Sequence, residues 1–75
     1  MAERVYDPSL IGMVVEFRHI VSGLTSIALV KEIVDHPGFN YYLGECLDHD
    51  YKAVIGKELS WDLYHFEIVN IGVNF

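Results

Sequence analysis

The dipeptide Pro37-Gly38, which separates two runs rich in β-branched and aromatic residues, constrains this chain more than any other feature. Proline and glycine together break a helix, and residues of the flanking types fit the half-buried surface of a sheet. We therefore predict two antiparallel strands, Ile27–Val34 and Tyr41–Leu47, joined by a turn over Asp35–Gly38. Gly44 interrupts the second strand, and a glycine there is typical of a bulge or a sharp bend.

Alternation of apolar and polar residues predicts three further strands outside this hairpin. They span Gly12–Ile20, Tyr51–Ile55 and Tyr64–Val69. Between the last two strands the alternation is lost, and the hydroxyl of Ser60 can accept hydrogen bonds from the free amides that follow it. The sequence therefore predicts one helical turn over Ser60–Leu63.

At 75 residues the chain has room for one domain, which we expect to span residues 1–75. Residues 1–9 form a polar lead-in with a turn at Asp7–Ser9, and residues 70–75 form a C-terminal edge strand or tail. Hydrophobic residues make up 52% of the chain, which predicts a globular fold. Because no apolar run is long enough to cross a bilayer, we expect a soluble protein without a membrane partner, and the single cysteine favours the reducing cytoplasm.

These elements predict an all-β fold, a small barrel of five to six antiparallel strands with one short helical turn before the last strand. The pattern resembles that of SH3-like, Tudor-like and Sm-like small barrels. Leu10–Phe17, Ala28–Ile33 and Tyr41–Leu43 carry the resemblance, and Ser60–Leu63 occupies the place of the short helical turn of those barrels. Where Sm-like proteins hold RNA with an Arg-Gly pair in their last hairpin, this chain has Asn70-Ile71-Gly72. The resemblance therefore implies a barrel fold and does not imply RNA binding.

The formal net charge of −6 argues against direct binding of nucleic acid, because contact with phosphates needs clustered lysine and arginine. A protein partner, either basic or itself nucleic-acid-binding, fits this charge better. Five acidic residues fall around the last two predicted hairpins and could form a face that imitates phosphates, or a shell that keeps an apolar protein in solution. They are Glu45, Asp48, Asp50, Glu58 and Asp62.

No residue pattern predicts catalysis, metal binding or a cofactor. The pairs of histidine and aspartate at Asp35-His36 and Asp48–Asp50 fall at opposite ends of one predicted strand, so they cannot converge on a metal. Cys46 has the acidic neighbours Glu45 and Asp48, which disfavour a reactive thiolate. We therefore expect no enzymatic activity, no metal and no cofactor, and we interpret Cys46 as a buried or half-buried structural thiol.

Exposed tyrosine and tryptophan side chains dominate protein interfaces, so Tyr42, Tyr64 and Trp61 are candidate binding residues. We expect Tyr42 and Tyr64 to be exposed. Trp61 could instead close the open end of the barrel.

An apolar alternation, Ile71, Val73 and Phe75, continues to the last residue. It predicts either a sixth strand or a sheet edge that pairs with another chain. We expect a non-enzymatic protein-binding module that acts as an adaptor or, through this edge, as a subunit of a homo-oligomer. The alternative is an inhibitor of the phage type, which imitates nucleic acid and blocks a host defence nuclease or another DNA-binding protein.

Overall fold

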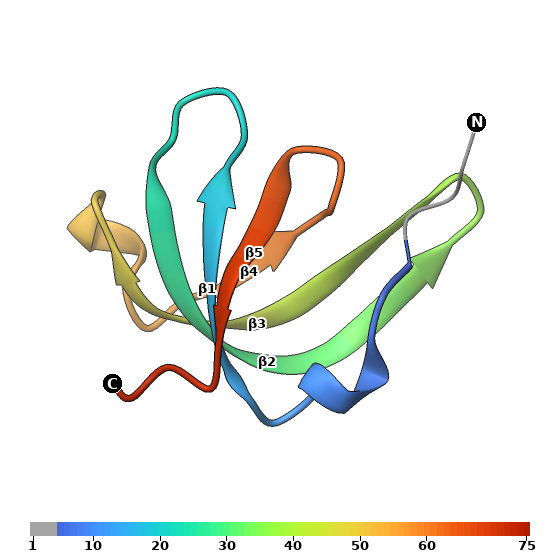
Figure 1. The fold of residues 1–75 in the computed structure, drawn as a ribbon, viewed down its shortest axis with the longest axis horizontal. Coiled ribbons are helices and arrows are strands. Elements are labelled where there is room, and N and C mark those ends of the chain that lie inside the picture. Colours follow the sequence, from blue (N-terminus) through green and yellow to red (C-terminus); the bar gives the residue numbers. More distant parts are fainter. Residues whose placement is uncertain (1–4) are drawn as a thin grey trace.

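A computed structural model describes residues 5–75 of the chain. These residues form one antiparallel sheet of five strands in the order β4-β3-β2-β1-β5 (Figure 1). The strands are β1 (Val14–His19), β2 (Thr25–His36), β3 (Phe39–His49), β4 (Glu58–Trp61) and β5 (Phe66–Ile71). Two single 3₁₀ turns, η1 (Pro8–Leu10) and η2 (Lys52–Val54), lie outside the sheet. The predicted all-β fold of five antiparallel strands is confirmed, and four of the five strands, all except β4, overlap the predicted ones.

The central hairpin is confirmed, and its turn is tighter than predicted. His36 pairs with Phe39, so only Pro37 and Gly38 connect β2 to β3. The proline ring fixes its own φ, and Gly38 has a φ of 95°, the combination that a type II turn requires. Both strands extend beyond the predicted bounds, and Figure 1 shows them as the two longest ribbons, curving together across the molecule.

Gly44 lies at the bend of this hairpin. It pairs with Val30, next to a register shift between Val30 and Glu32. A Cβ atom at Gly44 would approach the carbonyl oxygen of Leu29 to 2.4 Å, so only glycine allows the two backbones to come this close. The predicted bulge or bend is therefore confirmed, and it curls the sheet.

The curl brings together side chains from strands that are not neighbours. The rings of Phe17 on β1 and Trp61 on β4 stack with centroids 5.2 Å apart and an interplanar angle of 10°. The indole nitrogen of Trp61 also donates a hydrogen bond of 2.9 Å to the buried Oγ of Ser26 on β2. The buried apolar core consists of Leu10, Val15, Phe17, Ala28, Val30, Tyr42, Cys46 and Trp61.

The predicted barrel closure is wrong. Within residues 5–75, β4 pairs only with β3 and β5 pairs only with β1, so the sheet is open at both edges. The curl of the sheet stacks Trp61 on Phe17 and so forms a buried core, although β4 and β5 are not hydrogen-bonded to each other.

The predicted strand over Tyr51–Ile55 is also wrong, since this segment contains the 3₁₀ turn η2. The chain reverses here between β3 and β4, and the amide of Gly56 donates to the carbonyl of Cys46 at 2.7 Å where the ladder resumes. The apolar alternation of five residues between Asp50 and Gly56 was too short to identify a strand.

The helical turn predicted over Ser60–Leu63 is likewise wrong. Ser60 and Trp61 are extended and pair with Leu43 and Tyr42 at the end of β4. The chain turns after Trp61, and the capping residue is Asp62 rather than Ser60.

At the N-terminal end the turn predicted at Asp7–Ser9 is confirmed. Asp7 accepts a hydrogen bond of 2.9 Å from the amide of Ser9 and caps η1, which starts at Pro8. The part of the polar lead-in before Val5 lies outside the described residues.

Candidate functional site

Two adjoining hollows lie where the tip of the β2–β3 hairpin faces the loop between β4 and β5. The first hollow has a volume of about 390 Å³ and a mostly polar lining, and the second has a volume of about 570 Å³ and a mostly apolar one. Gly38, Phe39 and Tyr64 line both hollows, which we together call the aromatic cleft. The remaining lining residues are Tyr6, Asp35, His36, Pro37 and Asn40 in the first hollow and Tyr41, Ser60, Asp62 and His65 in the second.

The hairpin tip forms one wall of the aromatic cleft. Phe39 and Tyr41 lie two residues apart on β3, so their side chains share a face of the strand. Their rings stack with centroids 5.8 Å apart, and the His36 ring lies 5.2 Å from that of Phe39. Phe39 is 52% exposed. The tight turn thus gathers three flat side chains at the end of the hairpin.

The loop between β4 and β5 forms the opposite wall. The carboxylate of Asp62 accepts hydrogen bonds from the amides of Tyr64 and His65, at 3.2 and 3.1 Å, and lies 2.7 Å from Nδ1 of His65. An aspartate that accepts from amides two and three residues ahead fixes the course of a turn. This turn presents Tyr64, which is 41% exposed, so the predicted exposure of Tyr64 is confirmed.

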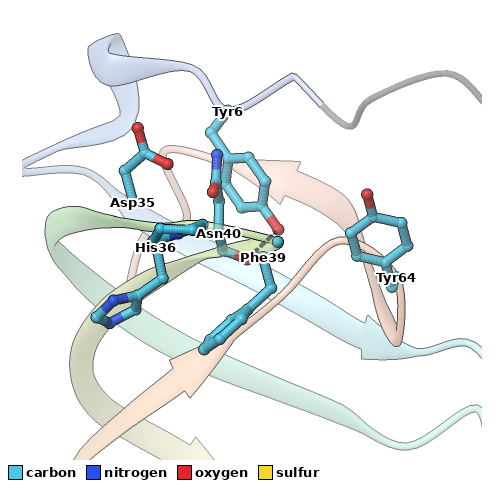
Figure 2. A pocket seen from close by; sticks show the side chains of 8 residues that line it. Tyr6, Asp35, His36, Phe39, Asn40 and Tyr64 are labelled. Carbon is cyan, nitrogen blue, oxygen red and sulfur yellow. Dashed lines mark hydrogen bonds between the residues drawn. The ribbon is translucent and has the colours of Figure 1, made fainter.

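Tyr6 joins the two walls at the back of the first hollow (Figure 2). Its hydroxyl donates a hydrogen bond of 2.6 Å to the carbonyl of Asn40 and accepts one of 2.8 Å from the amide of Leu63. With the Asn40 amide oriented toward its acceptors, its nitrogen donates to Asp35 at 2.8 Å. Burial raises the pKa of Tyr6, so its hydroxyl keeps its proton over a wide pH range.

Two of the three predicted aromatic binding residues are in the core. Tyr42 is 1% exposed and Trp61 is 2% exposed, so the predicted exposure of Tyr42 is wrong. Tyr42 points to the inner face of β3, where it pairs with Trp61 and its ring lies 5.9 Å from that of Phe17.

Phe39 is not among the predicted binding residues, because those were chosen among tyrosine and tryptophan alone. The signal that could have identified it is its position directly after Pro37-Gly38. A residue at the tip of a hairpin lies beyond the neighbouring strands that would cover it.

The five acidic candidates do not converge. Glu45 and Glu58 lie directly opposite each other on β3 and β4, whereas Asp62 lies at the far end of β4. Three of the five have a nearby basic group: Glu45 lies 3.9 Å from Lys31, Asp48 lies 3.5 Å from Lys52, and Asp62 contacts His65. Asp50 is exposed in the turn after β3. The carboxylates are therefore spread over β3, β4 and the turns that follow these strands.

Cys46 is buried, as expected, and its thiol donates a weak hydrogen bond to the carbonyl of Asp48 at 3.5 Å. Burial raises the pKa of this thiol, which disfavours the nucleophilic thiolate. No group of three or more histidine, cysteine, aspartate or glutamate residues within residues 5–75 is arranged to hold a metal ion. His49 instead accepts a local hydrogen bond of 2.9 Å from the amide of Tyr51.

The predicted oligomer edge lies at the outer side of β5. Ile71 ends this strand, and the amides of Gly72 and Val73 both donate to the carbonyl of Val14, at 2.8 and 2.9 Å. Ile71 and Phe75 are exposed, at 54% and 69%. In the part of the chain that is described, residues 72–75 form no sixth strand, so the apolar end of the chain leaves an open edge.

Within residues 5–75, a helix with the length and apolar character needed to cross a bilayer is absent. Comparison of the chain with models of protein families, with characterised proteins and with solved structures found no match. A function is therefore inferred from the geometry of the aromatic cleft and of the sheet edges.

Proposed function

We propose that this protein is a non-enzymatic binding module that takes a segment of a partner protein into the aromatic cleft. The observation that carries the proposal is that Phe39 and Tyr64, both substantially exposed, face one cleft from the start of β3 and from the β4–β5 loop. Large exposed rings around a concave site are typical of interface hot spots, because they bury much area at little cost in conformational entropy. The two hollows have different linings, which suits an extended segment that carries both polar and apolar side chains.

The charge of the aromatic cleft favours a basic segment. Asp35 and Asp62 line its two hollows, and the whole chain carries a formal charge of −6. A cationic side chain over an aromatic face gains both cation–π attraction and the field of the carboxylates. The unpaired Cys46 agrees with a cytoplasmic location of the module.

NMR titration with capped tripeptides tests the proposal. We expect Gly-Arg-Gly at millimolar concentration to shift the amide signals of Phe39, Tyr41 and Tyr64 in a saturable manner, and Gly-Glu-Gly to shift them little. Phe39→Ala and Tyr64→Ala should weaken the response about tenfold each, as truncation of a hot spot does. Tyr51→Ala is the matched control, since Tyr51 is an exposed aromatic residue outside the cleft. Shifts that cluster elsewhere, or none, would refute the proposal.

Mimicry of nucleic acid is the second candidate, and the pair Glu45–Glu58 favours it. Like charges directly opposite each other on two strands destabilise a sheet. A basic partner would relieve this repulsion by binding to both carboxylates. This binding should weaken steeply between low and high salt, whereas binding in the aromatic cleft should change much less. Glu45→Gln with Glu58→Gln should make the salt dependence shallower if mimicry is correct.

A further inference from the structure

The tip of the β2–β3 hairpin lacks support from the rest of the sheet. The ladder between β3 and β4 ends at the pair Tyr42–Trp61, so the residues from Val34 to Tyr41 form a two-stranded ribbon beyond it. Two strands alone are marginally stable in water. A binding wall built on such a ribbon needs another attachment to keep its position relative to the opposite wall.

One hydroxyl group provides this attachment. The Tyr6 Oη donates to the carbonyl of Asn40 on the ribbon and accepts from the amide of Leu63 on the opposite loop, at 2.6 and 2.8 Å. Figure 2 shows the Tyr6 ring beside Asn40, with Tyr64 on the other wall. Both partners are backbone groups, so the bridge fixes the course of each wall rather than one rotamer.

Tyr6 is itself anchored independently of the walls. Its ring lies 4.9 Å from that of Tyr42, and the amide of Asp7 donates to the Tyr42 hydroxyl at 2.8 Å. Asp7 in turn caps η1, whose Leu10 is buried in the core. The segment Tyr6–Leu10 therefore connects the cleft to the body of the molecule.

We propose that Tyr6 is a positioning residue whose hydroxyl sets the separation of the two walls of the aromatic cleft, so that the N-terminal segment is part of the binding site. The consequence for binding rests on the proposed function, whereas the coupling of the walls does not. Without the bridge, part of the binding free energy of a ligand that contacts both walls is lost in ordering them. With the bridge present, the walls are already ordered and the ligand binds more tightly.

The pair of variants Tyr6→Phe and Tyr42→Phe tests this role. Each removes one hydroxyl that holds the N-terminal segment and keeps the ring, but only Tyr6 contacts both walls. In Tyr6→Phe we expect the amide of Leu63 to exchange with solvent about tenfold faster, as loss of one hydrogen bond allows. We also expect new microsecond–millisecond exchange in ¹⁵N relaxation dispersion at Asn40, Tyr41 and Tyr64. Tyr42→Phe loosens the N-terminal segment but keeps both hydrogen bonds of the Tyr6 hydroxyl, so it should change these signals much less.

Equal responses of the two variants would overturn the positioning role. If Tyr6→Phe does not fold, ¹⁵N relaxation dispersion of the wild-type protein tests the proposal instead. Exchange of the hairpin tip and of the β4–β5 loop at different rates would then overturn the positioning role. The Gly-Arg-Gly titration separates the two proposals. Equal affinity for the wild type and Tyr6→Phe would refute the effect of Tyr6 on binding, whereas binding to neither would refute the proposed function and leave the coupling of the walls to be judged by the exchange data.

Discussion

Tyr41 and Tyr42 are neighbours on β3 and have opposite surroundings. Tyr42 lies in the core, against Phe17 and opposite Trp61 in the ladder, whereas Tyr41 stacks on Phe39 in the aromatic cleft. The side chains of adjacent strand residues point to opposite faces, so one step along the chain separates a structural ring from a candidate binding ring. The body of the sheet and the tip of the hairpin thus use the same residue types, and the presence of covering strands decides between them.

We expect the largest effect on stability from replacing Trp61, which lies in the body of the sheet. Trp61→Ala should lower the free energy of unfolding by about 3–5 kcal/mol, because it leaves a cavity against Phe17 and an unpaired buried hydroxyl on Ser26. Phe39→Ala at the tip should cost less than about 1 kcal/mol. Urea unfolding followed by circular dichroism measures both, and Trp61→Phe serves if the alanine variant does not fold. Similar losses at the two sites would abolish the distinction between body and tip.

Gly44 in the body of the sheet and Gly38 at the hairpin tip allow the same comparison for the backbone. Gly44→Ala in the body should cost about 3 kcal/mol, because its Cβ would press on the carbonyl of Leu29. Gly38→Ala at the tip meets no neighbouring atom and should cost only about 1 kcal/mol for its left-handed conformation, φ 95°. The same unfolding experiment compares the two variants. A larger loss for Gly38→Ala would mean that the turn, and not the bend, limits the stability of the hairpin.

Alkaline pH should destabilise the body. Burial raises the pKa of Tyr42 and of the Cys46 thiol in the folded protein. Each group then holds its proton more tightly when folded, so its contribution is complete at neutral pH and is lost as the pH rises above about 9. Unfolding free energies measured from pH 7 to 11 should therefore fall at the alkaline end. The fall should be shallower in Tyr42→Phe, and an unchanged slope would show that Tyr42 does not take part.

The sequence predicted the hairpin and its bend, because Pro37-Gly38 and Gly44 act through local backbone geometry. It also predicted β1 and β5 but not β4. It did not predict which tyrosine is buried, since both faces of β3 carry apolar residues and the choice depends on how β4 and β1 fold over one of them. The turn after Trp61 was placed too early for a related reason. Ser60 and Asp62 can both cap a turn, and the pairing of Ser60 with Leu43, a contact between distant parts of the chain, leaves this role to Asp62.

The sheet edge at β5 should show the smallest effect on folding. Ile71 is exposed at the end of this strand, so Ile71→Lys should change the free energy of unfolding by less than about 0.5 kcal/mol. If the edge pairs with a second copy of the chain, the added charge should convert an oligomer to a monomer in sedimentation analysis, as should deletion of Ile71–Phe75. Val21→Lys is the matched control, because Val21 is also apolar and exposed but lies in the turn after β1. A wild-type chain that sediments as a monomer at high concentration would exclude pairing at this edge and leave the aromatic cleft as the contact surface with the stronger physical support.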